Sequence, residues 1–215
     1  MENFKKTPQN TVKRIPKRGH YDKKTIYKIL DEAFVCHVGF VMDGQPFVIP
    51  TAYGREEDVI YLHGATTSRM MKALEKEIPI CITVTHLDGI VLARSLFNSS
   101  MNYRSVVLFG TATLVPDEQK NRALLVVSEQ ILKDRWDEAR VPSAKELKAT
   151  SILAVKIDSA SAKIRTGDPG DNKEDYDLPI WAGVIPITQV YGKPITDPAM
   201  RMEKEIPASV QKALK

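Results

Sequence analysis

Stretches of alternating or continuous apolar residues, separated by short polar turns, dominate the chain. Such stretches are typical of β-strands when they are rich in β-branched side chains and bounded by Gly, Pro, Asn or Asp. A few segments instead repeat their apolar residues at helical spacing. The pattern predicts strands over residues 34–42, 46–53, 59–63, 78–85, 90–93, 103–115, 151–165 and 179–191, and helices after an N-cap at Asp22, over residues 69–76 and within residues 116–148.

The turns between these segments favour antiparallel pairing. Asp43-Gly44 and Asp88-Gly89 each lie between two apolar runs, and Asp-Gly is a common two-residue hairpin turn. Gly110 lies inside a long predicted strand and indicates a bulge or bend. Strands do not alternate regularly with helices, as a parallel sheet requires. The sequence therefore predicts a mainly β fold with helical insertions, built as a mostly antiparallel barrel.

Length and charge indicate one globular domain with extensions. The 215 residues suffice for a single core, and 31 basic against 27 acidic residues give a net charge of +4. We expect a basic arm over residues 1–21, a barrel domain over residues 22–191, and a tail with a short helix over residues 192–215. The basic run near the N-terminus is interpreted as a solvated tail in preference to a binding patch. Its residues are Lys5, Lys6, Lys13, Arg14, Lys17 and Arg18.

The cysteines and the distribution of apolar residues indicate in which cellular compartment the protein is expected. Cys36 and Cys81 lie in apolar, strand-like runs and are expected to be buried thiols without a disulfide. The sequence has no apolar stretch of the roughly 20 residues that cross a bilayer, and its start lacks the apolar region of a secretory signal. We therefore expect a cytoplasmic protein with neither a membrane nor a nucleic acid as its partner.

A turn of small and polar residues joins one predicted strand to the start of a helix. It has the sequence HGATTSR, from His63 to Arg69. The first N–H groups of a helix lack partners within the helix, so this turn could hold a phosphate with the Ser68 hydroxyl and the Arg69 guanidinium. It lacks the glycine patterns of nucleoside-triphosphate and Rossmann dinucleotide sites. From the local sequence alone, a capped helix with Arg69 in solvent is the favoured alternative.

Two further features have both a chemical and a structural interpretation. Arg94-Ser95 and Arg104-Ser105 flank a polar loop, and they are either a pair of anion-binding elements or exposed residues of a surface hairpin. Trp181 follows a loop rich in Asp and Gly, and its indole either packs on a flat ligand or belongs to the core.

Histidines and acidic side chains form no metal-binding pattern. His20, His37, His63 and His86 are scattered without ligand spacing, and His37 is interpreted as a structural residue of a strand. The acidic residues between positions 168 and 177 lack the calcium-loop pattern, so we expect them on a solvated loop. No G-x-S-x-G motif is present, which leaves no support for a serine hydrolase.

Several motifs occur in an order that resembles a known family. They are QPFVIPTAY at residues 45–53, HGA with SRM at residues 63–70, DGIVLARS at residues 88–95, SMNYRSV at residues 100–106, and EDY with PIWAG at residues 174–183. The chain is similar in these motifs to the flavin-nucleotide-binding branch of the pyridoxamine 5′-phosphate oxidase-like superfamily, which includes the nitroimidazole-resistance proteins. The resemblance extends from about Arg18 to Tyr191.

The resemblance implies a split β-barrel that forms a homodimer and holds FMN in two grooves between the subunits. In such a site Ser68 and Arg69 bind the phosphate, residues 50–53 line the isoalloxazine with backbone groups, and Trp181 covers the flavin from the partner subunit. His63 lies beside the flavin and is the candidate catalytic residue. The residues implied to bind the cofactor are Pro50, Thr51, Ala52, Tyr53, His63, Gly64, Ser68, Arg69, Met70, Thr83, Val84, Thr85, Asn102, Tyr103, Arg104, Ser105 and Trp181.

The chain departs from the family's pattern at two places. Relatives often carry a His-His pair where this chain has Asn98 and Ser99, so a proton donor of some relatives is missing. The Arg-x-His substrate clamp of true pyridoxamine-phosphate oxidases has no counterpart. We therefore expect an oxidoreductase, similar to a nitroreductase, that passes electrons from a reductant through FMN to a small acceptor. The alternatives are a non-catalytic flavin-binding or storage protein and a pyridoxamine 5′-phosphate oxidase, and a deazaflavin or haem in the pocket also stays open.

Overall fold

The strands of the computed structural model form an antiparallel sheet that closes into a barrel. The structure describes residues 2–202 and 204–214. The barrel strands are β2 (Val35–Met42), β3 (Gln45–Glu56), β4 (Val59–Ala65), β5 (Pro79–Leu92), β6 (Ser100–Leu114) and β7 (Thr150–Arg165). They pair in the order β7–β4–β3–β2–β5–β6, and β6 pairs again with β7, which closes the ring. The prediction of a mostly antiparallel barrel is confirmed.

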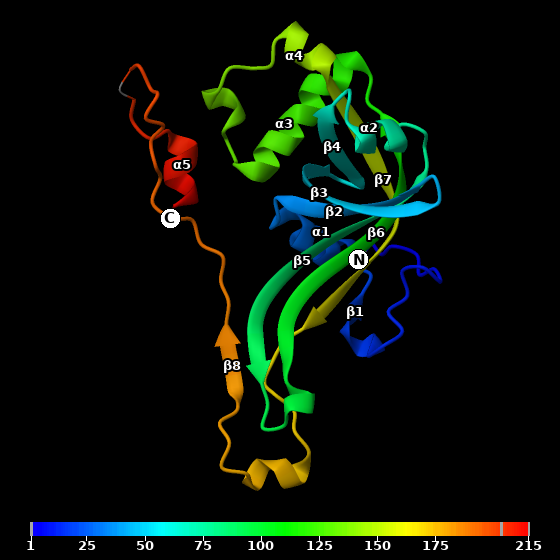
Figure 1. Ribbon diagram of the computed structural model, residues 1–215, viewed down its shortest axis with the longest axis vertical. Helices are drawn as coiled ribbons and strands as arrows, with labels where there is room; N and C mark the ends of the chain where they lie inside the picture. The colour runs from blue at the N-terminus through cyan, green and yellow to red at the C-terminus, as the bar shows by residue number, and fades with distance from the viewer. Residues whose placement is uncertain (1, 203, 215) are drawn as a thin grey trace.

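Helices cover one end of the barrel and one of its lower sides. Figure 1 shows α2, α3 and α4 around the upper end and α1 below β2. The sequence predicted a helical section over residues 116–148 with a break near Val141-Pro142, and the structure has a main helix, two 3-10 turns and, after a non-helical stretch that includes that dipeptide, a short final helix. The bounds are α1 (Lys23–Asp31), α2 (Arg69–Leu74), η3 (Asp117–Gln119), α3 (Lys120–Ile131), η4 (Trp136–Glu138), α4 (Ala144–Ala149) and, near the C-terminus, α5 (Ala208–Ala213).

The first predicted hairpin turn is confirmed. Met42 pairs with Gln45, so Asp43 and Gly44 form a two-residue loop between β2 and β3. Both residues have positive φ angles, 51° and 76°, as a type I′ turn requires. The bulge predicted at Gly110 is also present, because the pairing of β6 with β7 shifts register between Phe109 and Gly110.

The second predicted hairpin turn is wrong. Asp88 and Gly89 lie inside β5, which continues to Leu92, and the chain reverses only later, around η2 (Leu96–Asn98). The Asp-Gly pair instead marks a bulge, since the register with β6 shifts between Leu87 and Gly89. Gly89 also lies against a further strand, and a Cβ there would come within 3.0 Å of the Ile185 carbonyl oxygen. A close approach of two strands, not a turn, therefore requires this glycine.

Strand β3 packs closely against helices α1 and α3. Asp22 caps α1 as predicted, accepting a hydrogen bond of 2.8 Å from the Thr25 amide. The Tyr53 side chain is fully buried, and its hydroxyl donates to the Leu30 carbonyl. Next to it, Gly54 brings β3 so near to α3 that a Cβ would lie 2.6 Å from the Val127 backbone nitrogen.

The N-terminal segment is folded onto the barrel. Phe4 is 6% exposed, and Asn10 is 2% exposed and donates to the Ala160 carbonyl. The expected solvated tail is therefore wrong for the backbone of this segment, although the side chains of Lys13 and Arg14 are exposed. A buried amide in a polar sequence gives no periodic apolar signal, which explains the error. The segment ends in η1 (Pro16–Arg18) and β1 (Gly19–His20), which pairs with β7.

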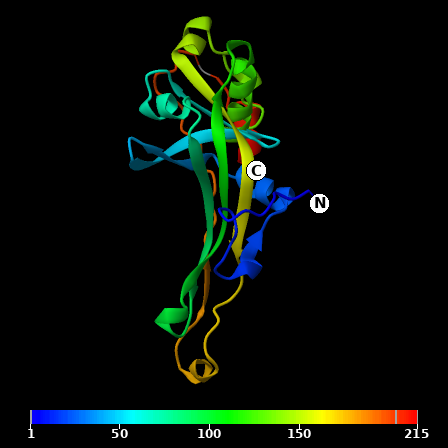
Figure 2. The same ribbon diagram turned by 90° about the vertical axis from the view of Figure 1, so that its right-hand side faces the viewer.

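The long strands continue beyond the barrel as a projecting ribbon, which Figures 1 and 2 show from two sides. The ribbon ends in η2 and in a loop that contains η5 (Lys173–Asp177), and β8 (Gly183–Pro186) pairs with its β5 edge. We call residues 88–102 and 164–186 the arm. Only residues 183–186 of the strand predicted over 179–191 are extended and paired.

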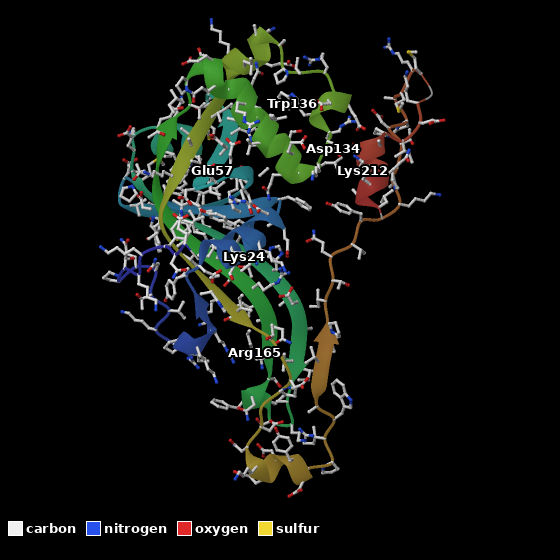
Figure 3. The ribbon with its side chains drawn as sticks, turned by 180° about the vertical axis from the view of Figure 1, so that it is seen from behind. Lys24, Glu57, Asp134, Trp136, Arg165 and Lys212 are labelled. Carbon is white, nitrogen blue, oxygen red and sulfur yellow. The ribbon has the colours of Figure 1, made fainter. Side chains whose placement is uncertain are left out.

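The chain returns from the arm to the helical end of the barrel. Beyond β8, residues 187–202 and 204–207 form a strap that lies outside the ribbon (Figure 1). The strap ends in α5, where the Ser209 amide donates to Glu138 over 3.0 Å and Lys212 pairs with Asp134 over 2.6 Å (Figure 3). None of the helices in the described ranges is long and apolar enough to cross a membrane.

Candidate functional site

Three of the predicted cofactor segments lie side by side on the outer face of the barrel. His37 in β2 pairs with Pro50 in β3 on one side and with Thr83 in β5 on the other. One step further along, Thr85 pairs with Ser105 in β6. We call these five positions the strip. Their side chains face outward, because residues that alternate with them on β2, β5 and β6 are buried, namely Cys36, Val38, Ile82, Val84 and Val106.

The same alternation points several predicted residues away from the strip. Val84 is 1% exposed and Tyr53 is fully buried, so only their backbone groups can face a ligand on the outer surface. Met70, a residue of α2, is 6% exposed and packs into the core. Asn102 is also buried, where it donates to the Gly167 carbonyl over 3.1 Å and accepts from Arg165. The predicted cofactor roles of these four residues stay predictions.

His37 belongs to the strip although the sequence favoured a structural role for it. Its side chain is exposed between Pro50 and Thr83, whereas its neighbours Cys36 and Val38 are fully buried. The signal was present in the sequence, since a histidine that alternates with apolar residues in a strand lies on the opposite face from them.

The turn between β4 and α2 presents one cation without a counter-charge. Ser68 caps α2, with its hydroxyl 3.5 Å from the Met71 amide. Arg69 is exposed and stacks over the Phe47 ring at 4.7 Å. No carboxylate in the part of the chain that the structure describes pairs with Arg69. The capped helix is therefore confirmed, and the phosphate-binding role of Ser68 and Arg69 stays a prediction.

His63 lies at the end of β4 with a buried and unsatisfied ring nitrogen. Its Nδ1 atom has no hydrogen-bond partner among the described residues. Burial lowers the pKa of His63 below its ordinary value, which favours the neutral imidazole at physiological pH. A neutral, unpaired imidazole nitrogen can bind a metal ion or exchange a proton with a ligand. The next residue, Gly64, packs against the Met71 side chain, which would lie 3.0 Å from a Cβ at that position.

The Arg94-Ser95 pair binds an internal anion. The Asp171 carboxylate accepts from the backbone amides of Arg94 and Ser95 over 2.9 and 3.2 Å and from the Arg94 guanidinium over 3.3 Å. The Asp171 side chain is 0% exposed, so its predicted place on a solvated loop is wrong. Hydrogen bonding from the Arg94 amide holds the pKa of Asp171 below its ordinary value. This carboxylate fastens the loop after β7 to the end of β5.

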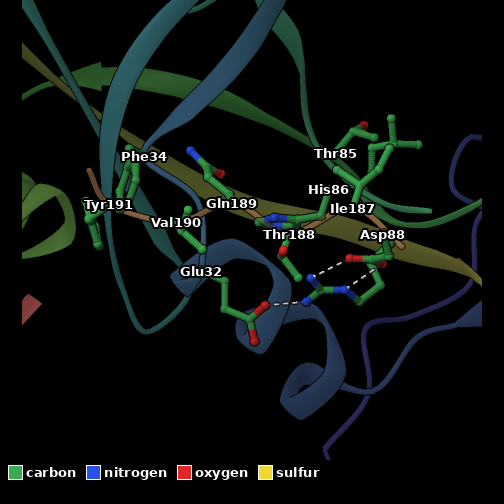
Figure 4. Close-up of a pocket in the computed structure, with 12 residues that line it drawn as sticks. Glu32, Phe34, Thr85, His86, Asp88, Ile187, Thr188, Gln189, Val190 and Tyr191 are labelled. Atoms are coloured by element: carbon green, nitrogen blue, oxygen red, sulfur yellow. Dashed lines mark hydrogen bonds and ion pairs between the residues drawn. The ribbon is translucent and has the colours of Figure 1, made fainter. Parts of the chain in front are cut away.

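Arg104 is held by two carboxylates at the edge of a pocket near the strip. Its guanidinium donates to Asp88 over 2.9 and 3.0 Å and also pairs with Glu32 (dashed lines in Figure 4). The hydrogen bonds with Asp88, and then those with Glu32, raise the pKa of Arg104 above its ordinary value. Because two negative charges already neutralise this arginine, it offers no net attraction to a phosphate.

The pocket beside Arg104 has a volume of about 760 Å³. Thr85 and Leu87 of β5 form one wall, Phe34 another, and the strap covers it with Tyr191 (Figure 4). The rings of Phe34 and Tyr191 approach each other, with centroids 6.3 Å apart. The pocket therefore joins the strip at Thr85 and is large enough for a small organic ligand.

Trp181 lies on the arm, 67% exposed, and is not a core residue. Its ring covers Gly183, where a Cβ would come within 2.9 Å of it. Gly183 pairs with Leu92 at the far end of β5, so one chain does not bring Trp181 to the strip. The described residues likewise contain no group of three or more His, Cys, Asp or Glu side chains placed to hold a metal ion.

Comparison with known proteins places this geometry in a family. The pyridoxamine 5′-phosphate oxidase family matches the chain over residues 22–164. The flavocytochrome Anf3 from Azotobacter vinelandii is 40% identical, with a TM-score of 0.90 over 96% of this chain and 97% of that chain. The FAD and haem binding protein from Mycobacterium smegmatis is 37% identical, with a TM-score of 0.88 over 92% and 97%.

A more distant solved structure shares the barrel. A protein from Bacteroides thetaiotaomicron that is assigned to 5-nitroimidazole antibiotic resistance is 26% identical, with a TM-score of 0.58 over 68% of this chain and 86% of that chain. No curated protein matches the chain significantly by sequence. The family match and the two near full-length likenesses agree with the strand order and with the resemblance seen in the motifs. The chain therefore belongs to the pyridoxamine 5′-phosphate oxidase-like family and has its flavin-binding split-barrel fold.

Proposed function

We propose that this protein is a flavin-dependent redox protein that passes electrons from a reductant to a small acceptor. The observation that carries the proposal is the likeness to two proteins, 40% and 37% identical over nearly the whole chain, one named a flavocytochrome and the other an FAD and haem binding protein. A bound flavin supplies the redox chemistry, and the chain's own residues bind the flavin, orient it and adjust its surroundings.

The strip is the proposed surface for the isoalloxazine ring. A flat ring system needs an even surface with a few hydrogen-bond donors at its edge. Thr83, Thr85 and Ser105 supply hydroxyl groups on adjacent strands, and β3 supplies backbone groups beside Pro50. His37 lies in the middle of this surface and would contact the ring face or edge.

Arg69 and Ser68 are the proposed anchors of the flavin phosphate. Arg69 has no carboxylate partner among the described residues, so its charge is available to an anion, which a charge-assisted hydrogen bond would hold. The resemblance in the motifs implies FMN, whereas the name of the Mycobacterium smegmatis protein favours FAD. The alternatives share the same flavin ring and differ in the adenylate half, which cofactor extraction distinguishes.

A second copy of the chain is the proposed partner at the strip. Large apolar side chains are exposed both beside the strip and on the arm, and contiguous patches of this kind mark interfaces. Val48 is 68% exposed beside the strip, and Phe97 and Trp181 on the arm are 95% and 67% exposed. A symmetric dimer would place each arm on the partner's barrel, where Trp181 would cover the flavin of the other subunit.

A second candidate function is that of a flavocytochrome, which holds a haem as well as the flavin. The observation that favours it is the buried His63 Nδ1 atom without a partner, since a neutral imidazole is a common axial ligand of haem iron. A haem would add one-electron chemistry to the site. His63 would then bind and orient the iron, instead of acting as the catalytic residue that the sequence predicted.

The test is to identify what the purified protein binds and whether it turns over. We expect flavin absorbance, release of FAD or FMN on denaturation, a mass of about twice 24.1 kDa in light scattering, and anaerobic bleaching by a nicotinamide or another physiological reductant. A Soret band that disappears in His63→Ala, with the flavin retained, would support the haem. The proposal would be refuted if the purified protein contained no flavin and also bound none when FAD or FMN was added to it. Flavin binding without electron transfer to any acceptor would instead favour the storage protein.

A further inference from the structure

A separate small cavity lies between the N-terminal segment and the outer face of β6 and β7. Its volume is about 250 Å³. The N-terminal segment supplies one wall, and the hydroxyl-bearing side of the two strands supplies the other. The residues that line it are Gln9, Asn10, Thr11, Val12, Lys13, Arg14, Ser105, Val107, Ser161 and Lys163.

This lining carries positive charge and hydrogen-bond donors without negative charge. Lys13, Arg14 and Lys163 contribute three cations, and none of the lining residues is acidic. No carboxylate in the described ranges forms an ion pair with these three side chains. Ser105 and Ser161 add hydroxyl groups on paired strands. The Ser105 hydroxyl donates to the Lys163 carbonyl over 3.3 Å, so Ser161 supplies the hydroxyl that is available to an anion.

The charge imbalance continues along β7 beyond the cavity. Arg165, labelled in Figure 3, is the last residue of β7, lies two positions after Lys163 on the same face and is only 8% exposed. Its recorded partners are the neutral oxygens of Asn102 and Gly167, not a carboxylate. Burial, and then the positive charge of Arg18, lower the pKa of Arg165 below its ordinary value. Cations gathered in this way repel one another, and a bound anion would relieve the repulsion.

We propose that this cavity binds the phosphate or diphosphate group of a small organic phosphate. The cavity is too small for a whole cofactor but suits a phosphate-sized fragment, and its cations and hydroxyl groups match the many acceptor oxygens of that group. A space of this size fits a small ligand better than the backbone of a nucleic acid. None of its lining residues except Ser105 belongs to the proposed flavin surface, so the cavity is a second site.

The position of Ser105 allows two sources for the phosphate. Ser105 lines the cavity and also pairs with Thr85 in the strip, so the cavity adjoins the flavin surface. The group is therefore either that of an independent ligand or the diphosphate of a dinucleotide flavin, in which case the flavin phosphate lies here and not at Arg69. The shared chemistry is a multiply charged phosphate, and the titration distinguishes the two sources.

The experiment is calorimetric titration of the full chain with pyrophosphate, ADP, FMN and FAD. Three variants are compared with the wild type: Arg14→Ala, Lys163→Ala and the two combined. Lys24→Ala is the matched control, because Lys24 is an exposed lysine on α1 outside the cavity (Figure 3). We expect each single variant to weaken binding of the phosphate-bearing ligand about tenfold or more, since each removes one charge-assisted contact.

Two results support the site and name its ligand. Loss of FAD affinity in the double variant, with FMN affinity and the control unchanged, assigns the cavity to the dinucleotide. Loss of pyrophosphate and ADP binding, with both flavins unaffected, assigns it to an independent ligand. The proposal is overturned if neither pyrophosphate nor ADP binds and FAD binds the double variant as tightly as the wild type. Circular dichroism confirms folding, and Lys163→Gln repeats the test with a side chain of similar length.

Discussion

Replacing Asp171 with alanine tests whether one buried carboxylate holds the arm together. In the structure this side chain accepts from two backbone amides and one guanidinium, and all three groups belong to the Arg94-Ser95 segment. Alanine removes every acceptor at once. The barrel core lies elsewhere, so we expect the arm to open locally while the barrel remains folded.

The expected magnitude comes from the bonds that are lost. A hydrogen bond to a charged group contributes about 1.5–3 kcal/mol, and an unsatisfied buried donor costs about 1–3 kcal/mol. Because the opened arm lets water reach the two amides, we expect the free energy of local opening to fall by about 2–4 kcal/mol. Hydrogen exchange of the Arg94 and Ser95 amides should then accelerate about 30- to 700-fold.

The assay is hydrogen exchange with mass spectrometry on peptides that cover the end of β5 and the loop after β7. Asp168→Ala is the matched control, because Asp168 is an exposed carboxylate of the same loop for which no bond is recorded. Asp171→Asn should lie between the two, since the amide keeps one acceptor but loses the charge. Equal exchange in the Asp171 and Asp168 alanine variants would refute the proposed fastening.

The same contact gives a pH dependence of definite sign. The pKa of Asp171 is lower in the folded arm than in an unfolded chain, so its contribution is fully present above the unfolded value of about 4. The contribution is lost as the pH falls through the lowered folded pKa. After correction for intrinsic rates, exchange protection of the Arg94 amide should therefore decline in acid, and it should show no such decline in Asp171→Ala.

Three further predictions concern the thiol, the helix packing and the phosphate anchor. Burial raises the pKa of Cys36 to about 12, so iodoacetamide at pH 8 should leave this thiol unlabelled in the native protein, and rapid labelling would contradict its burial. The free energy of unfolding should fall as the pH rises above about 9, because the thiol then ionises only in the unfolded chain. Gly54→Val should lower the free energy of unfolding by about 1–3 kcal/mol or more, because the side chain meets the backbone of α3, whereas Gly170→Ala has open space and should change it little in urea denaturation. Arg69→Ala should weaken flavin binding by about 1.5–3 kcal/mol in a fluorescence titration, with Lys72→Ala as the control; an unchanged affinity would return Arg69 to a purely solvent-exposed role.

Local signals in the sequence were sufficient wherever the structure is locally determined. The Asp22 cap and the Asp43-Gly44 turn depend on neighbouring residues alone, and both were predicted correctly. Asp88-Gly89 shows the limit of this reasoning. The same dipeptide lies within β5 because β6 and β8 both pair there, and those contacts come from distant parts of the chain.

Predictions about the site depend in the same way on long-range contacts. Strand alternation identifies Thr83 and Thr85 as outward-facing, so their place beside β6 follows from the sequence once the strands pair. No local pattern shows that Asp171 would be buried against Arg94, or that Glu32 and Asp88 would neutralise Arg104. Those partners lie far apart in the chain and meet only in the folded protein.

The most direct test of the central claim is a crystal structure of the flavin-loaded protein. The account predicts the isoalloxazine on the strip, against Thr83 and Thr85, with a phosphate near Arg69 and with Trp181 of a second copy covering the ring. A flavin bound away from these strands would contradict it, as would a flavin bound completely by one isolated chain.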